Sequence, residues 1–172
     1  MPRTALVVVV PEAEPLVGEW RERYDNASLG IPAHVTLLFP FVSTEVVDDA
    51  LLEELRALFA TQPSFSFSLP RVARFPDVAW LAPVPDAPFR RLTELIFSSY
   101  PDYPPYEGIH DEVIPHLTIT ESPGAPLDDI EREAAGSLPF ERRVARLEVI
   151  VEGADGRWRS RWRLPLSGAV RR

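Results

Sequence analysis

One order of secondary-structure elements occurs twice in this sequence, and the repetition restricts the folds that the chain can adopt. Apolar runs typical of strands are separated by stretches whose apolar residues recur at helical spacing. Counted from residue 33 and again from residue 114, the predicted order is strand, helix, strand, strand. Such a repeat favours an internal duplication, with two antiparallel lobes in an α+β fold.

The predicted elements cover most of the chain. Strands are expected at 4–10, 33–39, 65–75, 78–84, 114–120, 144–152 and 157–166, and helices at 12–25, 45–60, 87–99 and 127–138. Ser43 or Thr44 is expected to cap the second helix and Asp86 the third, while Pro70 bends the strand that contains it. The segment 101–108 predicts a rigid aromatic loop because of its prolines. Trp80 and Trp162 each lie 46 residues after the histidine that opens their half, which agrees with a repeat.

Composition excludes several kinds of chemistry. The 172 residues suffice for one substantial core, so we expect a single domain over 1–172. The net charge of −8 argues against a generally basic binder of polyanions. The absence of cysteine excludes disulfides, thiolate zinc sites and a cysteine nucleophile. Because all 18 basic residues are arginine, lysine chemistry is excluded, and three histidines carry most proton transfer near neutral pH.

Nothing in the sequence suggests membrane attachment. The apolar run at residues 5–10 is too short for a secretory signal, and no run approaches the roughly 20 residues of a membrane span. We therefore expect a cytoplasmic protein.

Two short motifs carry the strongest chemical signal. They read His34-Val35-Thr36 and His116-Leu117-Thr118, and both lie in apolar stretches that favour strands. Residues two apart in a strand share a face, so each motif presents an imidazole and a hydroxyl together. If a pseudo-twofold axis relates the two halves, both pairs converge on one cleft.

This set of side chains suits a phosphodiester. Opening a cyclic phosphodiester without a metal requires one group that deprotonates water and another that protonates the leaving oxygen, and a neutral imidazole with an imidazolium can share that work. Threonine hydroxyls can donate to the non-bridging oxygens as negative charge develops. The sequence has no H-E-x-x-H spacing, and we expect no metal and no cofactor.

Paired H-x-T motifs, here 82 residues apart, resemble the signature of the 2H phosphoesterase superfamily. With AHVTLLFPF around the first motif, VIPHLTIT around the second and FPDVAWLAPVP between them, the chain resembles bacterial proteins of the 2′-5′ RNA ligase family. The resemblance implies antiparallel sheets flanked by helices around a central cleft, and metal-independent processing of 2′,3′-cyclic phosphates or related linkages. It implies that His34 and His116 are the acid/base pair and that Thr36 and Thr118 hold the phosphate.

One departure from the family affects the substrate. Many members place a basic residue shortly after the second motif, where this chain has Thr120-Glu121. We expect a hydrolase that acts on a small nucleotide or an RNA end with a cyclic phosphate, working as a monomer. Two alternatives remain open: a non-catalytic nucleotide or RNA-end binding module, and 2′-5′ RNA ligase activity. The overall acidity argues against extensive contact with a long RNA backbone.

Further residues are weaker candidates. Phe41, Phe75 and Trp80 could stack on a base, although core packing is the favoured interpretation for each. Tyr106 could form the rim of the cleft. His110 matches neither motif, so an ordinary loop position is favoured over a substrate contact.

Arginines are concentrated near the C-terminus. Ten of the 18 fall within residues 132–172. In the predicted last strand Arg157, Arg159, Arg161 and Arg163 alternate with other residues and should share one face. A solvated hairpin face is the favoured interpretation, and the alternative is an anion-facing surface from which Arg161 reaches the phosphate.

Overall fold

The computed structural model describes residues 2–168 and contains antiparallel sheets flanked by helices, as predicted. The strands are β1 Thr4–Val9, β2 His34–Leu38, β3 Phe65–Leu69, β4 Val72–Phe75, β5 Val78–Leu81, β6 Leu117–Thr120, β7 Phe140–Val144, β8 Arg146–Glu152 and β9 Trp158–Pro165. The helices are α1 Glu14–Tyr24, α2 Asp49–Ala60, α3 Ala87–Ser99 and α4 Leu127–Ala135, with short 3-10 turns at Pro11–Ala13, Asn26–Leu29, Thr44–Val46 and Pro105–Gly108.

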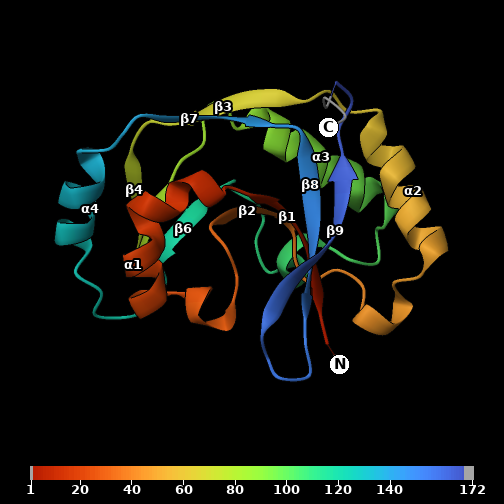
Figure 1. Cartoon of the computed structure of the whole chain (residues 1–172), viewed down its shortest axis with the longest axis horizontal. Helices are drawn as coiled ribbons and strands as arrows, with labels where there is room; N and C mark the ends of the chain where they lie inside the picture. Colours follow the sequence, from red (N-terminus) through yellow and green to blue (C-terminus); the bar gives the residue numbers. More distant parts are fainter. Residues whose placement is uncertain (1, 169–172) are drawn as a thin grey trace.

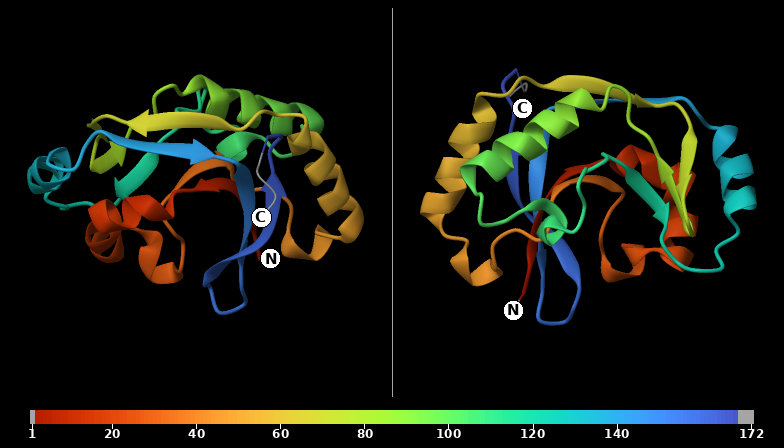
Figure 2. Two further views of the ribbon diagram at one scale, coloured as in Figure 1. Left: turned by 45° about the horizontal axis from the view of Figure 1, so that its top comes forward. Right: turned by 180° about the vertical axis from the view of Figure 1, so that it is seen from behind.

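The strands form three sheets. One has the order β2-β1-β8-β9, one has the order β4-β5-β6, and β3 pairs with β7. The two larger sheets belong to the two lobes, whereas the β3–β7 ribbon runs along the top of the molecule between α4 at one end and α2 at the other (Figure 1). Two further views show the same course of the β3–β7 ribbon along one side of the molecule (Figure 2).

The structure contains the predicted repeat of secondary-structure elements, but the first copy begins at β1 and not at the strand that starts near residue 33. The order β1-α1-β2-α2-β3-β4 is repeated as β5-α3-β6-α4-β7-β8. The sheet order β2-β1-β8 corresponds to β6-β5-β4, so each half gives its last strand to the sheet of the other half. The spacing of Trp80 and Trp162 was therefore a coincidence, because β5 corresponds to β1 and β9 is an additional strand.

The motif strands carry equivalent irregularities. The register of β1 against β2 shifts between Leu6 and Val7, and that of β5 against β6 shifts between Ala79 and Trp80. Val7 faces Thr36, and Trp80 faces Thr118. Because a bulge bends the strand that contains it, both H-x-T strands are bent just beyond their threonines.

Helices also cross between the halves. The helix α1 packs on β6, and α3 packs on β2, so each motif strand is covered by the helix that precedes the other motif strand. One buried cluster includes residues of both lobes, among them Leu37, Leu81, Phe89, Leu117 and Ile119. This shared core fixes the two motif strands relative to one another.

Several predicted boundaries were wrong. The strand expected over 65–75 is two strands in different sheets, because Pro70 has no N–H to continue a ladder. The strand β7 was missed, since its sequence FERRV lacks a continuous apolar face. The second helix is capped by Asp48, whose Oδ1 accepts a bond from the Leu51 N–H at 2.8 Å. Asp86 occupies the predicted N-cap position of α3, but its carboxylate accepts no backbone N–H there and instead binds Arg90 at 2.7 Å.

Within residues 2–168, no helix combines the length and the apolar character that crossing a membrane requires.

Candidate active site

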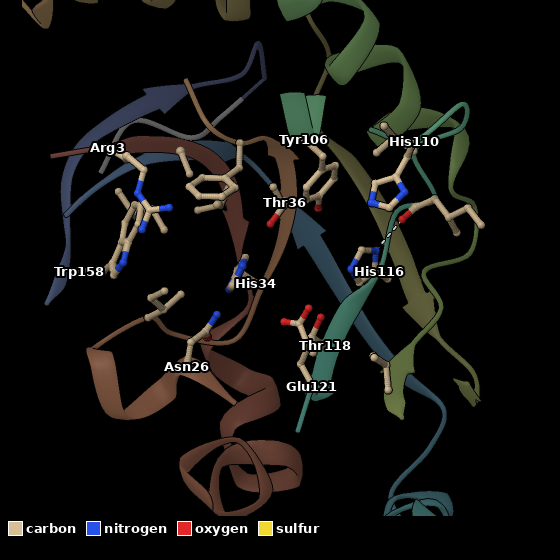
Figure 3. Close-up of a pocket in the computed structure, with 18 of the residues that line it drawn as sticks. Arg3, Asn26, His34, Thr36, Tyr106, His110, His116, Thr118, Glu121 and Trp158 are labelled. Carbon is tan, nitrogen blue, oxygen red and sulfur yellow. Dashed lines mark hydrogen bonds between the residues drawn. The ribbon is translucent and has the colours of Figure 1, made fainter. Parts of the chain in front are cut away.

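Both H-x-T motifs face one cleft of about 740 Å³ (Figure 3). Its wall includes His34 and Thr36, which belong to β2. It also includes Thr118 of β6 and His116, the residue directly before β6. The other lining residues are Arg3, Ala5, Val7, Asn26, Leu29, Ile31, Phe39, Phe75, Val78, Tyr106, His110, Glu112, Val113, Ile114, Glu121, Ile150 and Trp158.

Strand periodicity explains how the motif residues reach the cleft. Val35 and Leu37 are fully buried, whereas His34 and Thr36 between them are half-buried. The same alternation holds in the second motif, where Leu117 and Ile119 are buried. The expected convergence of two imidazole and hydroxyl pairs is confirmed.

The two imidazoles are anchored in the same way. Nδ1 of His34 lies 2.8 Å from the carbonyl oxygen of Pro32, and Nδ1 of His116 lies 2.6 Å from that of Ile114. A carbonyl oxygen can only accept a hydrogen bond, so Nδ1 carries the proton in the neutral ring. In both rings Nε2 is therefore the nitrogen that can gain or lose a proton.

The environment of His34 favours its neutral form. Burial lowers the pKa of His34 to about 4, and the positive charges of Arg21 and His116 lower it further, against the opposing effect of the Pro32 carbonyl. The Arg21 side chain is itself buried, and it binds Asp25 and Asn26. At neutral pH the Nε2 of His34 thus holds a free lone pair.

This pKa predicts a change of stability with pH. Between pH 6.5 and pH 4 the unfolded chain binds a proton at His34 that the folded chain does not, so the free energy of unfolding falls as the pH is lowered through that window. The loss assignable to His34 is about 1–3 kcal/mol, because one pKa unit corresponds to about 1.4 kcal/mol. Urea unfolding at pH 7.5 and at pH 4.5 measures how far the free energy of unfolding falls between the two values. This fall should be smaller in His34→Gln than in the parent. Equal drops in the two proteins would contradict the shifted pKa.

Tyr106 enters the cleft from a loop with unusual backbone conformation. Its φ is 51° and that of Glu107 is 56°, both in the left-handed region, and the Tyr106 N–H donates to the Phe39 carbonyl at 2.6 Å. The phenol points toward Thr36 (Figure 3). Burial raises the pKa of Tyr106, so its hydroxyl remains a hydrogen-bond donor. The conformation costs energy and persists because the surrounding contacts hold it.

Aromatic rings support His116. Phe75 and Trp80 stack with centroids 4.8 Å apart, and both approach the His116 ring edge-on, at 6.0 and 5.9 Å. Phe75 also lines the cleft, whereas Trp80 is 8% exposed and lies behind the imidazole. Of the three aromatic candidates, Phe75 is thus the one in a position to contact a ligand.

Phe41 and Arg161 are not among the described residues that line the cleft. Phe41 is buried against Tyr100 and Tyr103. Arg161 is exposed over the Trp162 ring, at a register shift between β8 and β9 that breaks the expected alternation of arginines. These two residues were candidates for substrate contact, and the structure does not bring them into the cleft wall that the described residues form.

Other cleft residues were not anticipated. Arg3 lies beside the paired Phe39 and Trp158 rings, with its guanidinium carbon 5.3 and 5.8 Å from their centroids, and it pairs with Glu152 at 2.8 Å. His110, expected as an ordinary loop residue, lies 5.6 Å edge-on from Tyr106 in the cleft wall. No local pattern in the sequence marks these positions, because the fold brings them together from separate loops.

The described part of the chain contains no group of three or more acidic or histidine side chains placed to hold a metal ion.

A two-lobed α+β fold in which each lobe supplies one H-x-T motif to a shared cleft defines a 2H phosphoesterase-type protein. The sequence model of the 2′-5′ RNA ligase superfamily matches residues 9–156, and the chain belongs to that superfamily. Membership in a superfamily of phosphoesterases and RNA ligases supports the conclusion that this protein is an enzyme.

Similar proteins agree with this assignment. A Geobacillus kaustophilus protein named "Putative phosphoesterase" is 26% identical over 160 residues, which are 88% of this chain and 90% of that protein. The structure of Escherichia coli LigT complexed with 3′-AMP superimposes with a TM-score of 0.62 at 19% identity, covering 96% of this chain and 98% of LigT. TT0787 of Thermus thermophilus gives a TM-score of 0.63 at 20% identity, with the same coverage. At these identities the two structures support the fold.

Proposed function

We propose that this protein opens 2′,3′-cyclic phosphates, on nucleotides or RNA ends, or related cyclic phosphodiesters, without a metal ion. The observation that carries the proposal is the cleft with two identically anchored imidazoles and a hydroxyl beside each. A binding module needs no matched pair of proton-transfer groups.

The charge environment suggests that the two histidines have different roles in proton transfer. His34 is neutral at pH 7, so its Nε2 accepts a proton from the attacking water as the water oxygen bonds to phosphorus. The bond from phosphorus to the 2′ or 3′ oxygen then breaks, and that oxygen takes a proton from Nε2 of His116. In total, one cyclic phosphodiester and one water molecule are converted to one phosphomonoester.

Hydroxyl donors stabilise the charge that develops on the phosphoryl oxygens. Thr36 and Thr118 approach from opposite sides of the cleft, and the Tyr106 hydroxyl beside Thr36 offers a further donor. We propose that this phenol partly replaces the basic residue that many relatives place after the second motif.

The comparisons favour a nucleotide ligand. LigT structures with 3′-AMP, with NADP+ and with ATP resemble this chain over nearly its whole length. By analogy we propose a small nucleotide or an RNA terminus as the substrate, bound by a monomer in the cytoplasm.

The central test is turnover in the presence of EDTA. The protein should convert 2′,3′-cyclic AMP or an oligonucleotide ending in a cyclic phosphate to a monoester, because the proposed proton transfers need no metal. Phosphorus NMR would follow the reaction and identify whether the 2′- or the 3′-phosphate forms.

Three outcomes would redirect the proposal. Ligand binding without ring opening would support the binding module. Joining of a cyclic-phosphate end to an RNA with a free 5′-hydroxyl would support 2′-5′ ligase activity. Reaction of cyclic ADP-ribose phosphate, but not of the two other substrates, would indicate a different cyclic phosphodiester.

A further inference from the structure

Glu121 lines the cleft on a backbone segment that is held by hydrogen bonds. It directly follows β6, and Figure 3 shows its carboxylate beside Thr118, in the space between His34 and His116. The Glu121 N–H donates to the Tyr24 carbonyl at 3.0 Å. The hydroxyls of Thr120 and Ser122 donate to the same oxygen, at 3.2 and 2.9 Å. The end of α1 therefore fixes the segment that carries this carboxylate.

Glu121 takes part in no ion pair with an arginine among residues 2–168. Two other charged residues of the cleft are paired outside it: Arg3 binds Glu152 at 2.8 Å, and Glu112 binds Arg90 at 2.9 Å. The phosphate of a ligand held by the two motifs would lie close to this charge.

Ring opening changes the charge of the ligand. A cyclic phosphodiester carries one negative charge, whereas the monoester product carries nearly two above its second pKa of about 6. A fixed carboxylate beside the phosphate repels both, and it repels the monoester about twice as strongly.

We propose that Glu121 selects ligands by charge: it disfavours phosphomonoesters relative to phosphodiesters, and so limits inhibition by the opened product and weakens the binding of nucleotides with terminal phosphates. This inference rests on the proposed function, because it assumes that the cleft holds a phosphodiester between the two motifs.

The expected size follows from Coulomb's law. One additional unit charge about 6 Å from a carboxylate changes affinity by about 3- to 100-fold, for effective dielectric constants between that of water and that of a protein surface. We expect that removal of the Glu121 charge raises the affinity for the monoester, relative to the affinity for the diester, by about tenfold.

Two unreactive ligands and one variant test the inference. 2′-Deoxyadenosine 3′-phosphate and its methyl ester lack the 2′-hydroxyl that could cyclise, and they differ only in the ester methyl group and in the second charge. Their dissociation constants, measured by calorimetry at pH 8, should change in ratio by about tenfold in favour of the monoester in Glu121→Gln. In the same variant the inhibition constant of the product should fall more than the KM for 2′,3′-cyclic AMP. The side chain is exposed and unpaired, so the variant should fold like the parent.

Glu22→Gln is the matched control, since Glu22 is an exposed carboxylate of α1 outside the cleft. It should leave the ratio unchanged. If Glu121→Gln also leaves the ratio unchanged while the parent still opens cyclic phosphates, the charge selection is wrong and the proposed function stands. If the parent binds neither ligand and opens no cyclic phosphate, the proposed function fails and the inference fails with it.

Discussion

Replacing His34 or His116 with alanine should lower the turnover number for a 2′,3′-cyclic phosphate by 10²- to 10⁴-fold each, the usual contribution of a positioned general acid or base. Affinity for a monoester ligand such as 3′-AMP should change far less, because the threonine hydroxyls remain. Both effects are expected from the proposed function, in which the Nε2 atoms of the two anchored imidazoles exchange protons with the ligand. Steady-state kinetics and calorimetry on each variant separate the two quantities.

The double variant gives a stricter test. Because the two histidines act as a unit, its loss should be much smaller than the product of the single losses. His110→Ala is the matched control, since His110 lines the same cleft but belongs to neither motif. We expect less than a tenfold effect from it. Turnover at the parental rate in His34→Ala or His116→Ala would place the active site elsewhere.

Asp25→Ala should lower the free energy of unfolding by about 3–5 kcal/mol, the cost of leaving a buried charge without its partner. The Arg21 side chain is 1% exposed, and its Nε lies 3.0 Å from the carboxylate of Asp25, which is 2% exposed. After the substitution the nearest carboxylate belongs to Glu14, 3.5 Å from the guanidinium. Urea unfolding of parent and variant measures the difference.

Two further variants check the cause. Arg21→Met combined with Asp25→Ala removes both charges and should recover much of the lost stability. Glu53→Ala breaks the exposed pair with Arg56 and should cost less than about 1 kcal/mol. A cost as small in Asp25→Ala would mean that water reaches Arg21.

The motif strands were predictable because their signal is local. Alternation of buried and half-buried residues around His34 and His116 depends only on the period of two along a strand. Convergence on one cleft then followed from the repeated order of elements. The pairing partners were not predictable in the same way, because the choice of β8 as the neighbour of β1, and of β6 as the neighbour of β5, depends on contacts distant in the sequence.

The rest of the site illustrates the same limit. Arg3 and Trp158 reach the cleft from two separate segments, and nothing in their immediate neighbours marks them. Glu121 was marked only by its place after the second motif, which did not predict that its carboxylate lines the cleft. The alternation of arginines in β9 misled the sequence analysis because one register shift moves the residues that follow it to the other face. The contacts of Phe75 and Trp80 with His116 were not predictable either, because they join the β4–β5 hairpin to a motif distant in the sequence.

The exchange of strands between the halves has a consequence for synthesis of the chain. While the ribosome has produced only the first half, β1 lacks its neighbour β8, and β4 has none of its own sheet. Open strand edges of this kind can pair with other chains, which favours aggregation. The edge of β1 is closed only when residue 152 has left the exit tunnel, so a product that is truncated or stalled before that point should be aggregation-prone even where it already contains both motifs.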